Sequence, residues 1–90
     1  MSDAFLKVAS TTDFKKLGSK IAYDLSEGSQ KLLVRAVGDS AIAITVKALI
    51  VTRSFLVYKG KDISITMAYD TFADVSGKML TGIVFTVNLL

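Results

Sequence analysis

At 90 residues the chain forms a single domain, residues 1–90, near the lower size limit for folding without disulfides or metals. It contains no cysteine and no histidine, which excludes a disulfide framework, a thiolate metal site and the commonest general base of enzymes. The formal net charge of +3 permits a nucleic-acid partner without requiring one. The apolar content of 51% exceeds what so small a core can hide, which favours an oligomer.

No membrane or export segment is expected. The longest uncharged run, Met79 to Leu90, is shorter than the ~20 residues that a membrane-spanning helix needs. The N-terminal sequence MSDAFLKV lacks the basic and then apolar pattern of a signal peptide. We therefore expect a cytoplasmic protein with no membrane partner.

The first third of the chain predicts a strand, a helix and a second strand. Residues 4–10 (AFLKVAS) are typical of a strand. A helix is expected next, capped by Thr12 or Asp13 and ended by Gly28. Residues 31–37 (KLLVRAV) predict the second strand. The apolar stripe of the helix has a spacing of three or four residues and consists of Phe14, Leu17, Ile21 and Leu25.

A long apolar helix is predicted from Asp39, whose carboxylate can cap it, to about Val57. From residue 41 to 51 only Thr45 and Lys47 are polar, so the helix has almost no hydrophilic face. We expect one side to pack on a sheet and the other on a second subunit. The alternative is a helix buried in an unusually thick monomeric core. The expected dimer contacts are Ile42, Ile44, Val46, Leu49 and Ile50.

The remaining residues predict two strands. Residues 63–69 alternate apolar and polar side chains, as in a half-buried strand, and residues 79–90 form the last strand. Residues 70–78 between them fit either a wide turn or a hairpin arm. The order β-α-β-α-β-β predicts an α+β two-layer sandwich, with two helices packed on one face of a four-stranded mixed sheet.

Four stretches in the same order carry a resemblance to a known family. They are LKVAS, RAVGDSAIAITVKALIVTRSF, DISITMAY and TGIVFTV. Together they resemble the stage V sporulation protein S family, a bacterial relative of the Alba chromatin proteins, over nearly the whole chain. The residues that mark the central stretch are Gly38, Val46-Lys47-Ala48, Ile50, Arg53 and Phe55.

The resemblance implies an Alba-like fold, a homodimer with higher oligomers left open, and nucleic-acid binding with DNA favoured over RNA. It also implies a developmental or architectural regulator. The sequence departs from Alba proteins where they contact DNA. Thr11 and Thr12 replace a basic pair after the first strand, and Asp39 follows the strand-end glycine. Ala43 and Ile44 stand where sporulation-type members tend to have amides. The DNA contacts therefore do not carry over residue by residue.

A candidate phosphate-binding surface lies at the start of the first helix. Lys15 and Lys16 fall in its first turn and Lys20 one turn later, beside free backbone N–H groups. The hydroxyls of Thr11 and Thr12 can add hydrogen bonds to phosphate oxygens. Lys78 lies where an Alba-like hairpin arm would reach along DNA. Binding through these groups would be salt-sensitive and would discriminate little between sequences.

The alternative for these lysines is an ordinary solvated face, with Lys20 and Asp24 as an i,i+4 pair and Lys78 as a turn residue. Arg35 lies in an apolar strand, which predicts a carboxylate partner or a groove edge. The three tyrosines could stack on bases, but nothing in the sequence interleaves them with lysines.

The sequence contains no motif that would support an enzymatic activity. Asp70 and Asp74 lack a third metal ligand, and SGK at residues 76–78 is no phosphate loop because Phe72 replaces its first glycine. We expect no cofactor, metal or small-molecule substrate. Two hypotheses remain, a dimeric nucleic-acid-binding protein and a protein–protein interaction module of the same fold. They differ in whether the positive side chains converge on one face or lie among acidic residues such as Asp13, Asp24 and Asp39.

Overall fold

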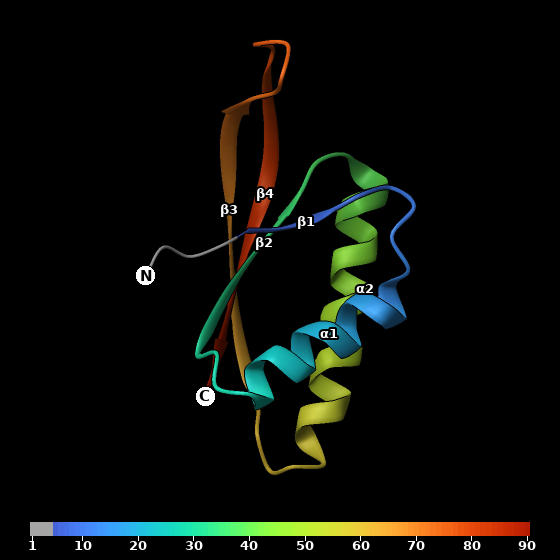
Figure 1. The fold of residues 1–90 in the computed structure, drawn as a ribbon, viewed down its shortest axis with the longest axis vertical. Coiled ribbons are helices and arrows are strands. Elements are labelled where there is room, and N and C mark those ends of the chain that lie inside the picture. Colours follow the sequence, from blue (N-terminus) through green and yellow to red (C-terminus); the bar gives the residue numbers. More distant parts are fainter. Residues whose placement is uncertain (1–4) are drawn as a thin grey trace.

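The computed structural model describes residues 5–90 and places both helices on one face of a four-stranded sheet (Figure 1). This confirms the predicted order of elements and the two-layer fold. Position 4, the first of the predicted opening strand, lies outside the described residues. The elements are β1 Phe5–Val8, α1 Phe14–Ser26, β2 Lys31–Ala36, α2 Asp39–Val57, β3 Ile63–Ala73 and β4 Met79–Leu89.

The sheet is mixed, with strand order β1-β2-β4-β3. β1 and β2 run parallel because α1 crosses over between them, whereas β4 is antiparallel to both of its neighbours. α2 leads from β2 to β3 at the far edge, and β4 then returns into the gap between β2 and β3. β3 is therefore an edge strand that follows directly from the apolar helix.

The segment 70–78 belongs to a hairpin arm, one of the two alternatives left by the sequence. β3 and β4 stay paired from Ile63↔Leu89 to Ala73↔Met79, and their outer half extends beyond the rest of the molecule (Figure 1). The turn is closed by Asp74, whose Oδ1 accepts hydrogen bonds from the backbone N–H groups of Ser76 and Lys78, each at 2.9 Å.

The two helices pack closely where Gly18 of α1 meets α2. A Cβ atom at Gly18 would lie 2.5 Å from the carbonyl oxygen of Ala48 and 2.7 Å from Cβ of Val51. At this crossing the Thr52 hydroxyl donates a hydrogen bond of 2.8 Å to the Gly18 carbonyl. Glycine is therefore the residue that permits this close approach of the two helices.

α2 turns polar residues inward and apolar residues outward. Thr45 and Thr52 have no exposed surface, whereas Ile50 is 62% exposed. Burial of the two threonines costs little free energy because each hydroxyl donates a hydrogen bond to the carbonyl oxygen four residues earlier. The distances are 2.8 Å from Thr45 to Ala41 and 3.1 Å from Thr52 to Ala48. The outer surface of α2 therefore remains apolar after the core is complete.

Both helices begin and end where the sequence predicts, but the expected cap of α2 is wrong. Asp13 caps α1, and Gly28 follows its end with a φ of 116°. Asp39, in contrast, is the first residue of α2, and its carboxylate caps nothing; the N-cap is Gly38, with a φ of 89°. The expected carboxylate cap at Asp39 is wrong because the glycine turn puts Gly38 at the N-cap position and leaves Asp39 as the first residue inside the helix.

By length and composition alone, α2 could also cross a membrane, even though charged residues interrupt its apolar sequence. Core helices of globular domains have the same length and composition. Here α2 packs against α1 and also contacts β1 and β2.

Candidate nucleic-acid interface and apolar face

The side chains of Lys15 and Lys16 are exposed at the start of α1, as predicted. The free N–H groups expected beside them are already used. Asp13 Oδ1 accepts hydrogen bonds from the backbone nitrogens of Lys15 at 2.9 Å and Lys16 at 3.3 Å. The Thr12 hydroxyl oxygen accepts a hydrogen bond of 2.9 Å from the backbone N–H of Ala9. A phosphate at this place would therefore meet the two ammonium groups rather than the helix terminus itself.

A third lysine, from α2, lies against the residue that precedes Lys15 in the chain. The ammonium of Lys47 lies 5.7 Å from the centroid of the Phe14 ring, at the first residue of α1. We call Lys15, Lys16 and Lys47 the basic cluster. Among residues 5–90, none of the three has a carboxylate within ion-pair distance. Sequence reasoning missed Lys47 because its neighbour Phe14 lies far away in the chain, and no local pattern connects them.

The other predicted phosphate ligands are not gathered at this place. Lys20 lies along α1 and is bonded to Asp24, with 3.4 Å between Nζ and Oδ2. Thr11 is exposed in the loop before α1, and Lys78 is exposed in the turn that joins β3 to β4. The predicted positive side chains therefore do not all lie together. Lys15 and Lys16 are adjacent at the start of α1, whereas Lys20 and Lys78 lie elsewhere, and Lys20 is neutralised by Asp24.

Arg35 has the carboxylate partner that its apolar strand predicts. It lies on the face of the sheet opposite the helices, where its Nη2 is 2.6 Å from Oδ2 of Asp70. Its guanidinium also stacks over Phe72, 4.1 Å from the ring centroid. Asp70 and Phe72 belong to the base of the hairpin arm, so this contact ties the arm to β2. Arg35 is accordingly a structural residue here.

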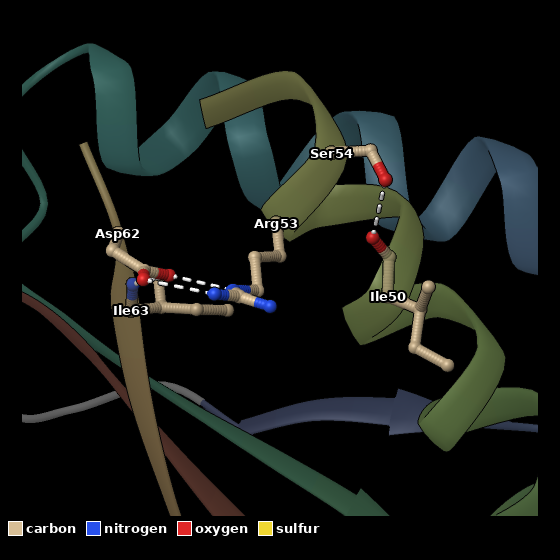
Figure 2. A network of polar contacts seen from close by, with 5 residues as sticks. All are labelled: Ile50, Arg53, Ser54, Asp62 and Ile63. Atoms are coloured by element: carbon tan, nitrogen blue, oxygen red, sulfur yellow. Dashed lines mark hydrogen bonds and ion pairs between the residues drawn. The ribbon is translucent and has the colours of Figure 1, made fainter. Parts of the chain in front are cut away.

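Arg53 and Asp62 join the end of α2 to the start of β3 (Figure 2). Arg53 donates from Nε at 2.9 Å and from Nη2 at 3.2 Å to the two carboxylate oxygens, and Asp62 Oδ1 also accepts the backbone N–H of Ile63 at 2.8 Å. The guanidinium hydrogen bonds, followed by the Ile63 N–H, lower the pKa of Asp62. The pair fixes α2 beside the edge strand.

Between α2 and the sheet, an apolar hollow of about 250 Å³ lies next to this pair. Two of the predicted dimer contacts, Val46 and Ile50, are exposed at its rim, and Leu49 lies buried in it. Ile42 and Ile44 are half-buried against the core. We call the hollow and its rim the apolar face; it is lined by Val46, Leu49, Ile50, Arg53, Ile65, Met67 and Phe85.

Met67 and Ile65 of β3 extend the apolar face beyond what the sequence indicated. The alternation of β3 predicts that both face the helices, as they do, but it predicts burial as well. Met67 is instead 65% exposed and Ile65 38%. They are uncovered because α2 packs mainly over β1 and β2, whereas β3 lies at the opposite edge of the sheet.

Comparison with known proteins places this arrangement in a known class. The structure resembles Alba from Thermoplasma volcanium with a TM-score of 0.64 and 15% sequence identity, over 94% of this chain and 99% of that one. The fold is therefore Alba-like. The family model for stage V sporulation protein S matches residues 4–89, so the chain belongs to that family. A search of curated proteins gives no significant match.

Proposed function

We propose that the chain is a cytoplasmic, non-enzymatic homodimer that binds nucleic acid, DNA in preference to RNA, as an architectural or developmental regulator. The observation that carries the proposal is the uncompensated basic cluster. Elsewhere in the described chain, Lys20, Arg35 and Arg53 each pair with an aspartate. Lys15 and Lys16 are adjacent in α1, and Lys47 of α2 reaches the ring of Phe14, the residue before them; none of the three lysines has such a partner among residues 5–90. Concentrated positive charge of this kind is suited to phosphate.

Binding at the basic cluster would act mainly through phosphates. The lysine side chains supply charge without reading base edges, so affinity would depend on salt more than on sequence. Lys20 can reach phosphate at the expense of its long contact with Asp24, and Lys78 offers a separate contact from the hairpin arm. The Alba-like fold supports the same conclusion, and the apolar face supports the dimer.

The proposal is tested by titrating the protein into a fluorescent DNA duplex at several salt concentrations and measuring anisotropy. Lys15→Glu/Lys16→Glu should abolish binding at moderate salt. Each lost phosphate contact should lower the slope of log K against log salt by about 0.9. Lys16→Glu alone should weaken binding more than Lys7→Glu, a matched charge reversal on the opposite face of the sheet. Equal effects of the two single variants would contradict a localised interface.

A protein–protein interaction module of the same fold is the second candidate. It is favoured by the acidic residues within the candidate interface, since Asp13 caps the helix directly before Lys15 and Lys16, and Asp24 neutralises Lys20. On this hypothesis the intact dimer would bind no duplex even at low salt. The lysines would then serve solubility, and the exposed apolar residues would hold the partner.

A further inference from the structure

A second hollow, of about 210 Å³, lies between the C-terminal halves of α1 and α2. We call it the interhelical hollow. It shares no lining residue with the apolar face. Its floor is made by carbon atoms and its rim by hydroxyls, two aromatic rings and one ammonium. The lining residues are Ser19, Ala22, Tyr23, Ser26, Phe55, Leu56 and Lys59.

Two aromatic rings from different helices line the interhelical hollow while remaining accessible. Tyr23 of α1 is 64% exposed and Phe55 of α2 is 50% exposed. An exposed ring beside a hollow offers a flat apolar surface on which another planar group can stack. The sequence showed no interleaving of aromatic residues with lysines. The fold creates it by bringing Tyr23, Phe55 and Lys59 to one place.

Lys59 gives the hollow its positive charge. Its Nζ donates a long hydrogen bond of 3.4 Å to Ser26 Oγ, and no carboxylate lies within ion-pair distance in the described part of the chain. The end of α2 fixes its position. Gly60, with a φ of 71°, ends the helix by donating to the Val57 carbonyl, while Lys61 donates to that of Leu56. Lys59 is therefore held beside the rings and is free to bind an anion.

The outer surface of α1 connects the hollow with the basic cluster. Lys16, Lys20 and Tyr23 are four and three residues apart, which places them along one side of the helix. The helix spans about 20 Å from its first to its last residue. A flexible polyanion that contacts the basic cluster can therefore follow this side of α1 and reach the rings at the other end.

We propose that the interhelical hollow binds an unpaired base of a single-stranded nucleic acid, stacked on Phe55 and Tyr23, with Lys59 at the adjoining phosphate. The inference rests on the proposed function and extends it to a second class of nucleic acid. Aromatic rings beside a positively charged surface are the usual means of holding single strands. The hollow is smaller than the roughly 300–1,000 Å³ that holds a drug-sized ligand, so it suits one base of a longer strand.

The experiment compares three fluorescent probes by anisotropy at low salt. They are a twelve-nucleotide thymidine strand, the same strand with abasic sites in its centre, and a DNA duplex. Phe55→Ala should weaken binding of the thymidine strand by about 5- to 100-fold, because one stacked base is lost. Binding of the abasic strand and of the duplex should change less than twofold. Phe55→Tyr should restore strand binding because the ring is retained.

Two control variants separate stacking from general effects. Val57→Ala truncates an equally exposed residue of α2 that does not line the interhelical hollow, and it should leave all three affinities unchanged. Lys59→Gln should weaken binding of both single strands but not of the duplex. Thermal unfolding of each variant verifies that the fold is intact, which is expected because Phe55 is half exposed.

The outcomes distinguish failure of this inference from failure of the proposed function. Equal binding of the thymidine and abasic strands by the unmodified protein, or an equal loss of strand and duplex binding in Phe55→Ala, would overturn the base site. If the duplex binds and no single strand does, the base site is wrong and the proposed function stands. If no probe binds, both are wrong, and an acidic peptide with an aromatic residue becomes the ligand to test.

Discussion

At the scale of single residues, the Arg53–Asp62 pair makes stability depend on acidity. The guanidinium hydrogen bonds lower the pKa of Asp62 below its usual value near 4. A carboxyl whose pKa is lower in the folded protein stabilises the fold above its unfolded pKa, and this contribution is lost as the pH falls through the folded pKa. We therefore expect Asp62→Asn to reduce the free energy of unfolding at neutral pH, and this reduction should diminish as the pH falls below about 4 and the carboxyl becomes protonated.

Urea unfolding at a series of pH values, at one protein concentration, provides the measurement. The difference between the unmodified protein and Asp62→Asn should shrink steadily below pH 4. In an Arg53→Met background the same substitution should have a smaller effect at neutral pH, because the partner is absent. Because the pair is exposed, the effect should be modest. Unfolding curves that stay equally far apart as the pH falls well below 4 would contradict the assignment.

Single residues also show the limits of prediction from sequence. The cap at Asp13 could be predicted, because an acidic residue just before an apolar periodic segment is a local signal. The same signal failed at Asp39, where the glycine turn takes the cap position. Lys47 and Lys59 could not be assigned to surfaces, because Phe14 and Ser26 meet them only through the packing of α1 on α2.

At the scale of elements, the crossing of α1 and α2 depends on Gly18. In an exposed helix, replacing glycine by alanine stabilises by about 1 kcal/mol. At Gly18 the sign should reverse, because the new methyl group would press on the Ala48 carbonyl and the Val51 side chain. We expect Gly18→Ala to lower the free energy of unfolding by about 1–3 kcal/mol. Chemical denaturation measures it, with Ser19→Ala as the neighbouring control. An increase in stability would show that the helices move apart without cost.

The elements and their order were predictable because each carries a local periodic pattern with glycine or a cap at its ends. The hairpin arm was left open because residues 70–73 become a strand only by pairing with β4. The sequence also did not indicate which side of α2 faces the core. Its threonines lie inside because their hydroxyls bond within the helix and to Gly18, so a polar residue there does not mark the solvent side.

At the scale of the whole molecule, the exposed apolar residues form surfaces rather than scattered positions. Val46 and Ile50 of α2 meet Ile65 and Met67 of β3 around one hollow. A contiguous apolar surface of this kind usually marks an interface. A stable interface of standard size covers about 800 Å² per partner, roughly a seventh of the 5779 Å² surface of this chain. The apolar face is the surface that we propose for a two-fold contact.

Ile50→Glu and Met67→Glu should therefore convert a dimer into a folded monomer. Both side chains are mostly exposed in the single chain, so the substitutions cost its fold little, whereas in a two-fold interface each would bury two unpaired carboxylates. Light scattering coupled to gel filtration measures the mass, and circular dichroism verifies the helices. Val75→Glu, an equally drastic change at the tip of the hairpin arm, should leave the dimer intact. A dimer that survives both substitutions would exclude the apolar face as its interface and direct the search to the open face of the sheet.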